Sequence, residues 1–300
     1  MPVFRDDFPR WQQLITPSWL DRLMAGVAVR AAPASHWCLL EVDCGALDAF
    51  LQCHIPGAAY LDTARLEEGP FWNKVADAAL LQVLLGLGIR HDTTVILYGR
   101  NMTAAARAAH LMLYAGVTDV RLLDGGVHAW LRAGLPCATG APQRYAAATR
   151  FGATFPGRPH YLINMRQAKA LLWQSDGALA SIRTWDEFTG KTSGYSYIQA
   201  RGDIPGARWG RAGTGTDMNN MSAFHGSDGS MRPASDICQF WRDQGLHPGL
   251  QTAFYCGTGW RASLAFFYAW LMGWERISVY DGGWFEWSHA EPVFSETIRQ

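Results

Sequence analysis

The sequence predicts an α/β protein with two similar domains, each a parallel sheet flanked by helices. Two observations lead to this prediction. A long segment of the first half recurs in the second half, and each copy alternates short apolar runs with a helical segment. This alternation is typical of β–α–β units, in which the strands pair in parallel. A chain of 300 residues is long enough for two ordinary domains.

The first copy of the repeat reads HIPGAAYLD (54–62) and then VILYGRNMTAAARAAHLMLYAGVTDVRLLDGGVHAW (95–130). The second reads DIPGARWGR (203–211) and then TAFYCGTGWRASLAFFYAWLMGWERISVYDGGWFEW (252–287). Gly99 lies 25 positions before Asp124, and Cys256 lies 25 positions before Asp281. A repeat of this length indicates a duplicated domain rather than a solenoid.

Each copy predicts the same elements in the same order. An apolar run rich in β-branched residues predicts a strand, and a glycine-containing loop follows it. The next segment predicts a helix of about a dozen residues, and a second apolar strand ends at Asp-Gly-Gly. The segment 137–160 is rich in Ala, Gly, Pro and Thr without periodicity. We therefore predict domains at 1–140 and 161–300, joined by a linker at 141–160.

The two halves differ in the stretch before the position of Cys256. Gly57 to Gly99 spans 42 positions, whereas Gly206 to Cys256 spans 50. The additional length lies near 210–231, where Gly, Ser, Thr and Asn are frequent. Such a segment is either a tolerated surface insertion or a loop that shapes the mouth of a site in the second half.

Composition narrows the class of protein. Lys plus Arg and Asp plus Glu number 26 each, which gives no sign of a nucleic-acid partner or an anionic membrane surface. The six cysteines (38, 44, 53, 137, 238 and 256) form no CxxC pair, so we expect free thiols in a reducing compartment and no metal site. With no recognisable signal peptide or membrane span, a cytoplasmic location is expected.

Cys256 is the candidate nucleophile. It lies at the predicted junction of a strand and a helix, where unpaired backbone N–H groups and the helix dipole favour an anion. Gly257 and Gly259 leave room for these N–H groups to turn inward, and Arg261 adds positive charge. Both effects favour a reactive thiolate. The alternative, a small buried packing residue, is weakened because the equivalent position of the other copy is Gly99.

These motifs resemble the tandem rhodanese-domain sulfurtransferases over roughly residues 15–290. ITPSWLDRLMAG (15–26) is similar to the opening helix of the family, HIPGA and DIPGA to its central turn, and the two DGG segments to its closing turn. CGTGWR (256–261) resembles the six-residue active loop, and its start is close to the CG[ST]G of mercaptopyruvate sulfurtransferases.

The resemblance implies that Cys256 attacks a sulfur donor and holds the sulfur as a persulfide. It also implies that the backbone of Gly257, Thr258, Gly259, Trp260 and Arg261 cradles that sulfur, and that the first domain is non-catalytic. Gly99 replaces an acidic residue that is more usual there. Arg183, in SIRTWDEF (181–188), fits the arginine that binds the substrate anion, although Ser181 replaces the family's Asp. Alternatively, Arg183 ties the strand end to a nearby carboxylate.

The function expected is transfer of a sulfane sulfur from a small donor to a thiol or cyanide acceptor, with no cofactor. Thr258 replaces a cation of thiosulfate-specialised members, which favours 3-mercaptopyruvate over thiosulfate. A second hypothesis is a sulfur-relay module that accepts persulfide from a partner protein. A phosphatase or arsenate reductase is disfavoured, because four residues separate Cys256 from Arg261 where related phosphatases have five. His225 and His289 receive no role.

Overall fold

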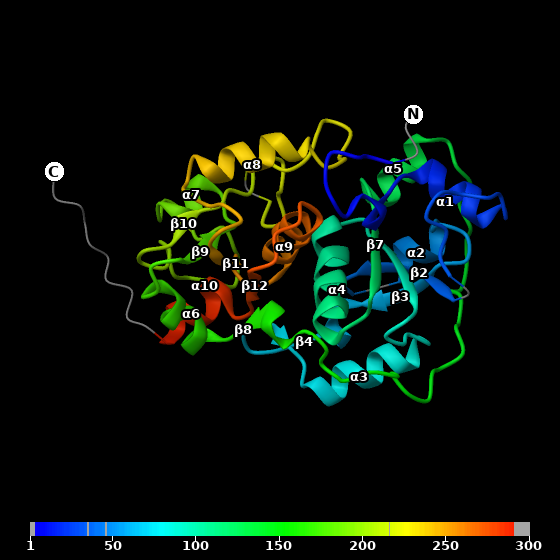
Figure 1. The fold of residues 1–300 in the computed structure, drawn as a ribbon, viewed down its shortest axis with the longest axis horizontal. Helices are drawn as coiled ribbons and strands as arrows, with labels where there is room; N and C mark the ends of the chain where they lie inside the picture. The colour runs from blue at the N-terminus through cyan, green and yellow to red at the C-terminus, as the bar shows by residue number, and fades with distance from the viewer. Residues whose placement is uncertain (1–3, 35, 46, 216, 291–300) are drawn as a thin grey trace.

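A computed structural model describes residues 4–34, 36–45, 47–215 and 217–290. It confirms two α/β domains, each with a five-stranded parallel sheet. Figure 1 shows the two sheets on opposite sides of a central pair of helices, α4 and α9. The strand order is β1-β7-β6-β2-β3 in the first domain and β8-β12-β11-β9-β10 in the second, so the duplication holds strand by strand.

The first domain contains the elements from η1 to α5. Its sheet is formed by β1 (Leu14–Ile15), β2 (Trp37–Asp43), β3 (Ala59–Asp62), β6 (Thr94–Tyr98) and β7 (Asp119–Leu123). Its helices are η1 (Trp11–Gln13), α1 (Pro17–Met24), α2 (Asp48–Gln52), η2 (Thr63–Arg65), α3 (Asp77–Gly86), α4 (Met102–Ala115) and α5 (Gly126–Arg132). A short antiparallel hairpin, β4 (Glu67–Glu68) with β5 (Asn73–Lys74), follows η2.

The second domain repeats this plan. Its sheet is formed by β8 (Leu162–Ile163), β9 (Gly177–Ser181), β10 (Arg208–Trp209), β11 (Gln251–Tyr255) and β12 (Ile277–Tyr280). Its helices are η3 (Pro159–Tyr161), α6 (Met165–Leu172), α7 (Trp185–Phe188), α8 (Ala234–Arg242), α9 (Trp260–Leu271) and α10 (Gly283–Ala290). The strands and the long helix predicted around Gly99 and Cys256 are therefore confirmed as β6-α4-β7 and β11-α9-β12.

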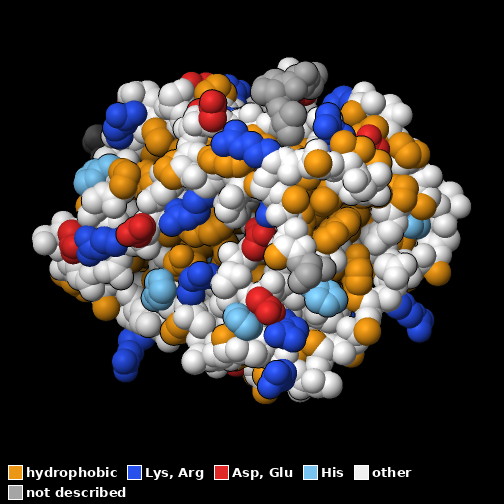
Figure 2. Space-filling model, turned by 45° about the vertical axis from the view of Figure 1, so that its right-hand side comes forward, with side chains coloured by type: hydrophobic (Ala, Val, Ile, Leu, Met, Phe, Trp, Pro, Cys, Tyr) orange, Lys and Arg blue, Asp and Glu red, His pale blue; other side chains and the backbone are white. Residues whose placement is uncertain are grey.

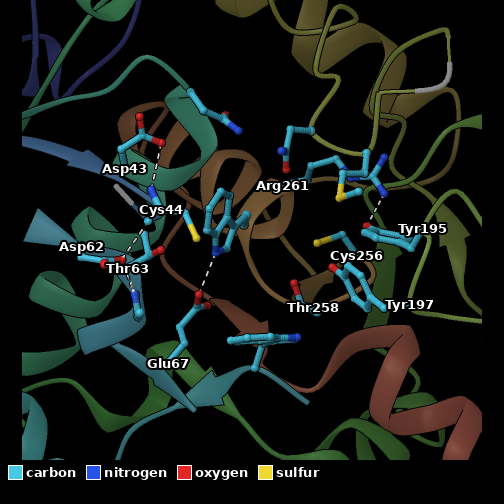
Figure 3. A pocket seen from close by; sticks show the side chains of 17 residues that line it. Asp43, Cys44, Asp62, Thr63, Glu67, Tyr195, Tyr197, Cys256, Thr258 and Arg261 are labelled. Atoms are coloured by element: carbon cyan, nitrogen blue, oxygen red, sulfur yellow. Dashed lines mark hydrogen bonds between the residues drawn. The ribbon is translucent and has the colours of Figure 1, made fainter. Parts of the chain in front are cut away.

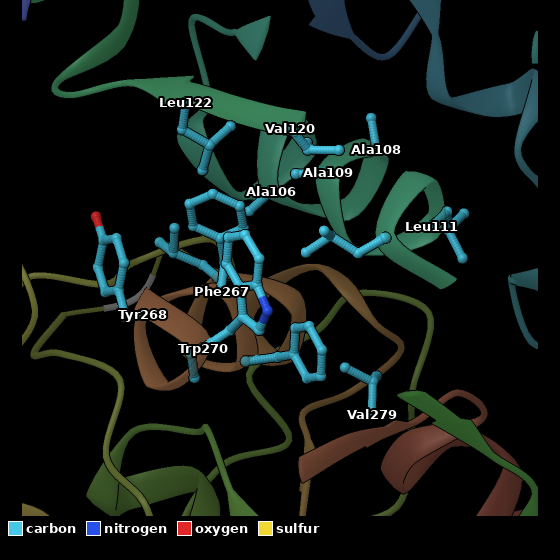
Figure 4. Close-up of a cluster of buried hydrophobic side chains, with 14 of the residues drawn as sticks. Ala106, Ala108, Ala109, Leu111, Val120, Leu122, Phe267, Tyr268, Trp270 and Val279 are labelled. Atoms are coloured by element: carbon cyan, nitrogen blue, oxygen red, sulfur yellow. The ribbon is translucent and has the colours of Figure 1, made fainter. Parts of the chain in front are cut away.

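Helices α4 and α9 join the two domains into one core. The described side chains of α4 from Thr103 to Ala115 are all buried, because one face packs on the first sheet and the other on α9. Apart from Arg107, the side chains of residues 103–109 are small, so α9 can approach closely and insert Phe267 and Trp270 (Figure 4). One hydrophobic cluster consequently spans both domains.

The two Asp-Gly-Gly turns each contact the opposite domain. Asp124 accepts a hydrogen bond from the backbone N–H of Met231 at 2.8 Å. Its counterpart Asp281 accepts one from the backbone N–H of Lys74 at 2.7 Å and one from the Arg107 side chain at 2.5 Å. Each domain therefore supplies donors for the closing turn of the other.

The proposed linker runs over the surface of the first domain. Residues 141–158 form no helix or strand. Backbone hydrogen bonds nevertheless join Gln143 to Ala58, Ala148 to Leu85 and Gly157 to Ala115. The segment is thus anchored along its length rather than free.

Two expectations about cysteine need correction. Cys53 and Cys137 form a disulfide, so the prediction that every thiol is free was wrong. Cys38, Cys44, Cys238 and Cys256 are free. Because disulfides are typical of oxidising compartments, the cysteine pattern no longer supports a reducing one. Among the helices described, none is long and apolar enough to cross a bilayer.

The surface charge agrees with the balanced composition. On the face drawn in Figure 2, Lys and Arg side chains are interspersed with Asp and Glu, and hydrophobic side chains lie between them. This face therefore carries no extended basic patch of the kind that binds nucleic acid.

Candidate functional site

Cys256 lies directly after β11 and four residues before the first residue of α9, as the sequence predicts. The residue is 2% exposed, yet it lines a cavity of about 480 Å³. The N-terminal turn of α10 fixes the loop, because Trp284 and Phe285 donate backbone hydrogen bonds to the carbonyls of Cys256 and Gly257 at 2.8 and 2.9 Å. Gly283, at φ +55°, is required here: a Cβ would lie within 2.8 Å of three loop carbonyl oxygens.

Gly257 and Gly259 are needed for close approach by other side chains. A Cβ on Gly257 would lie 2.2 Å from the Tyr195 ring, and Tyr195 Oη accepts a hydrogen bond from the Gly257 N–H at 2.9 Å. A Cβ on Gly259 would lie 2.9 Å from the Arg107 guanidinium of the first domain. The predicted inward turning of the N–H groups therefore does not apply to Gly257, whose N–H already has a partner.

Arg261 is engaged by a buried carboxylate. Its guanidinium forms two hydrogen bonds with Glu187, at 2.9 and 2.8 Å, and also contacts Tyr195 Oη. Burial alone would raise the pKa of Glu187, but hydrogen bonds and charges from Arg261, together with the charge of Arg183, hold that pKa below its ordinary value. The negative charge of Glu187 therefore offsets much of the electrostatic effect of Arg261 on the Cys256 thiol.

The cavity lies between the two domains. In Figure 3, Tyr195, Tyr197, Cys256, Thr258 and Arg261 of the second domain face Asp43, Cys44, Asp62, Thr63 and Glu67 of the first. Trp72 and Trp260 also line it, as do Met218 and Asn219. The last two belong to the 210–231 segment, which supports the interpretation that this segment shapes the mouth of the site.

A network from the first domain holds Trp260. Glu67 accepts a hydrogen bond from the Trp260 indole N–H at 2.8 Å and another from Arg107 Nε at 2.7 Å. Arg107 is fully buried and also binds Asp281. The first domain therefore positions one side of the loop 256–261. By contrast, Trp270, Trp274, Trp284 and Trp287 are buried core residues.

Arg183 does not line the cavity. Its side chain is fully buried and donates hydrogen bonds to the Gly202 carbonyl at 2.6 Å, to Asp203 at 3.1 Å and to the Ser193 carbonyl at 3.0 Å. Asp203 also accepts a hydrogen bond from Ser181 at 2.7 Å. The structure thus supports the alternative in which Arg183 ties the strand end to a carboxylate.

Several residues of the site were not predicted. Glu187 completes a capping box with Thr184 on α7, and the pattern Thr-x-x-Glu could have revealed it. Tyr195 and Tyr197 lie in a loop without periodicity, so no pattern marks them. Burial raises the pKa of Tyr195 well above its ordinary value, which keeps its hydroxyl protonated beside Cys256.

Within the described residues, no group of three or more His, Cys, Asp or Glu side chains is arranged to hold a metal ion. His225 donates to or accepts from Tyr268 Oη at 2.9 Å, and His289 contacts the Phe285 carbonyl at 2.9 Å. Neither lines the cavity that contains Cys256.

Comparison with known proteins explains the repeated architecture. The family model of the Rhodanese-like domain matches residues 16–133 and again 164–290. The chain belongs to the rhodanese family. The two matches contain the Gly99 loop and the Cys256 loop, so this rhodanese chain is a tandem in which only the second loop carries a cysteine.

The relatives of this rhodanese chain include thiosulfate sulfurtransferase YnjE of Escherichia coli, which is 53% identical over 93% of the chain. The chain spans 64% of the length of YnjE. The crystal structure of YnjE superposes with a TM-score of 0.92 at 52% identity, covering 95% of this chain and 68% of that one. The sulfur carrier protein TtuD of Thermus thermophilus is 29% identical and covers 93% of this chain and 95% of its own length.

A third relative is the anaerobic ergothioneine biosynthesis enzyme of Chlorobium limicola, solved with its natural substrate trimethyl histidine. It is 36% identical, with a TM-score of 0.90, and the match covers 96% of this chain and 72% of that one. A structure of the enzyme EanB, also 36% identical with a TM-score of 0.89 over 95% of this chain and 71% of that one, contains a cysteine persulfide with ergothioneine.

Proposed function

We propose that the chain is a sulfurtransferase that carries one sulfur atom as a persulfide on Cys256. The observation that carries this proposal is the position of Cys256, on a fixed loop before α9 and facing a cavity of about 480 Å³ between the domains. The pseudo-equivalent loop has Gly99, which has no side chain to carry sulfur.

Sulfur transfer through Cys256 consists of two displacement reactions at sulfur and needs no external oxidant or reductant. The Cys256 thiolate attacks the sulfane sulfur of a donor, a Cys256 S–S bond forms, and the donor fragment leaves with the electron pair of the broken bond. An acceptor nucleophile then attacks the outer sulfur, and the electron pair of the S–S bond returns to Cys256. The first turn of α9 supplies unpaired N–H groups and a dipole that stabilise the thiolate in both steps.

The relatives support sulfur transfer. One is named a thiosulfate sulfurtransferase, one is named a sulfur carrier, and one contains a persulfide on a cysteine. The persulfide in the EanB structure supports assigning the same sulfur-carrying role to Cys256 in this chain.

The cavity lining bears on the sulfur donor, for which the sequence favours 3-mercaptopyruvate over thiosulfate. A preference for 3-mercaptopyruvate requires Arg183 to meet its carboxylate, but Arg183 is buried against Asp203. Among the described residues that line the cavity, Arg261 is the cationic one, and Glu187 neutralises it. Neither thiosulfate nor 3-mercaptopyruvate therefore meets an unpaired cation there. This favours the second candidate, a module that receives persulfide sulfur from a partner protein.

Intact-mass spectrometry tests both candidates. The purified chain is incubated separately with thiosulfate, with 3-mercaptopyruvate and with a persulfidated cysteine desulfurase. We expect a cyanide-labile gain of one sulfur mass, absent in Cys256→Ser and retained in Cys44→Ser, the matched control for a second thiol in the cavity. Loading by the desulfurase alone identifies a relay module. Sulfur retained by Cys256→Ser would overturn the proposal.

A further inference from the structure

The first-domain wall of the cavity carries uncompensated negative charge. Asp43 accepts a hydrogen bond from the Cys44 N–H at 2.9 Å, and Asp62 accepts them from Ala64 at 2.9 Å and Gly45 at 3.4 Å. These donors are neutral. Across the described ranges, no Lys, Arg or His lies within ion-pair distance of either carboxylate.

The charges elsewhere around the cavity do not offset this wall. The third acidic residue, Glu67, is matched by Arg107 at 2.7 Å, and Arg261 is matched by Glu187 at 2.8 Å. Each of these two ion pairs has no net charge. The charges of Asp43 and Asp62 therefore make the cavity lining negative overall. Burial and the charges of these two carboxylates also raise the pKa of the adjacent Tyr60 to about 12.

Aromatic side chains make up much of the remaining lining. Trp72, Tyr195, Tyr197 and Trp260 border the cavity, and they come from both domains. Trp260 is held by its hydrogen bond to Glu67, while Trp72 is 43% exposed at the edge. Aromatic faces beside carboxylates attract organic cations, and quaternary ammonium groups most of all.

From this combination we infer that the sulfur acceptor is a small organic cation, whose ammonium group lies against Asp43, Asp62 and the aromatic wall. The reacting atom then faces Cys256 on the opposite side of the cavity (Figure 3). This inference rests on the proposed function of Cys256. For a thiol acceptor, the thiolate attacks the outer persulfide sulfur, a new S–S bond forms on the acceptor, and Cys256 leaves as thiolate.

A series of acceptor thiols that differ in charge provides the test. The persulfidated protein is mixed with thiocholine, 2-mercaptoethanol or 3-mercaptopropionate, and loss of the persulfide is followed by intact mass. The same rates are measured for Asp43→Asn, Asp62→Asn and the double variant, in which asparagine still accepts the backbone hydrogen bonds. Asp243→Asn, an exposed acidic residue outside the cavity, is the matched control.

The ratio of the thiocholine rate to the 3-mercaptopropionate rate is the quantity compared between variants. The intrinsic reactivity of each thiol cancels in this comparison, because it is the same for every protein. We expect each Asn substitution to lower the ratio about fivefold, and Asp243→Asn to leave it unchanged. A double variant that loads sulfur normally and keeps the wild-type ratio overturns the inference.

Choline binding separates this inference from the proposed function. Choline cannot accept sulfur, so its affinity for Cys256→Ser, measured by calorimetry, is independent of persulfide chemistry. Binding that is lost in the added Asp43→Asn and Asp62→Asn background supports the cation site even if Cys256 never loads sulfur. Absence of choline binding, with normal loading of the wild type, contradicts the cation site alone.

Discussion

Arg261 and Glu187 form a buried ion pair directly under the Cys256 loop. Both side chains are almost completely buried, and Glu187 also caps α7 through the Thr184 N–H at 2.6 Å. Removing one partner of such a pair leaves a buried charge without compensation, which costs more than the pair itself contributes. The pair therefore holds α7 and α9 together, and this role accounts for Arg261 better than direct contact with the sulfur.

We predict that Arg261→Ala lowers the free energy of unfolding by about 3–5 kcal/mol. The double variant Arg261→Met with Glu187→Gln should lose less, because it removes both charges and keeps the capping acceptor. Urea denaturation measures the stability of each variant, and the pH dependence of iodoacetamide alkylation measures the reactivity of Cys256. A stable Arg261→Ala protein whose alkylation profile moves to higher pH would mean that the arginine serves the thiolate instead.

Individual site residues differ in how far the sequence could identify them. Cys256 was identifiable because the repeat supplies an internal comparison with Gly99. Arg183 was ambiguous, since an arginine after a strand can face a substrate or a carboxylate, and only the position of Asp203 decides. Asp43 and Asp62 are the last residues of ordinary strands, and nothing in the sequence around them shows that they lie across the cavity from Cys256.

At the level of elements, the turns β7–α5 and β12–α10 are equivalent in sequence but differ in their partners. Asp281 accepts a hydrogen bond from the cation Arg107, whereas the hydrogen bond described for Asp124 comes from the neutral Met231 N–H. Burial therefore raises the pKa of Asp124 to about 6. Because the folded state holds this proton more tightly than the unfolded state, the contribution of Asp124 to stability is favourable at low pH and is lost as the pH rises through about 4 to 6.

Asp124→Asn should accordingly be more stable than the wild type at pH 7, by about 3 kcal/mol, with the difference disappearing near pH 4. Asparagine retains an acceptor for the Met231 N–H and cannot ionise. Urea unfolding at several pH values measures the difference. Asp281→Asn is the matched variant at the equivalent position and should instead destabilise the protein at pH 7, since it removes a partner of Arg107. Equal stability of Asp124→Asn and wild type across this range would contradict the argument.

The long elements were predictable and the short ones were not. The strand–helix–strand units around Gly99 and Cys256 have strong apolar patterns, and the repeat fixes their register. Five strands contain only two residues each, which is too short to show an alternation of apolar and polar residues: β1, β4, β5, β8 and β10. Their positions depend on contacts with distant segments, such as the bond of Lys74 to Asp281.

For the molecule as a whole, the Cys53–Cys137 disulfide ties α2 to the segment after α5. The bond closes a loop across 84 positions, with the Cα atoms 5.3 Å apart. Spacing in the sequence does not reveal such proximity, which is why the expectation of free thiols failed. Cross-linking positions so far apart stabilises a domain mainly by restricting its unfolded chain.

Reduction of this bond should destabilise the protein by about 2–4 kcal/mol. We expect a reducing agent to lower the Tm of the wild type. The double variant Cys53→Ser with Cys137→Ser should have the Tm of the reduced wild type whether or not the reducing agent is present. Cys44→Ser, which removes an exposed free thiol, should behave as wild type. Identical melting of oxidised and reduced wild type, with the bond verified by mass, would show that the disulfide contributes nothing to stability.

The structure around Gly99 makes it hard to place a nucleophilic cysteine in the first domain. A Cβ there would lie 2.6 Å from the Asn101 carbonyl oxygen and 2.9 Å from that of Val42, both backbone atoms. The loop has closed over the space that a nucleophile would need, so restoring a cysteine would require the backbone to move as well. A cysteine at position 99 alone therefore cannot give the first half a nucleophile in the present backbone, and this half contributes to the cavity as its opposite wall.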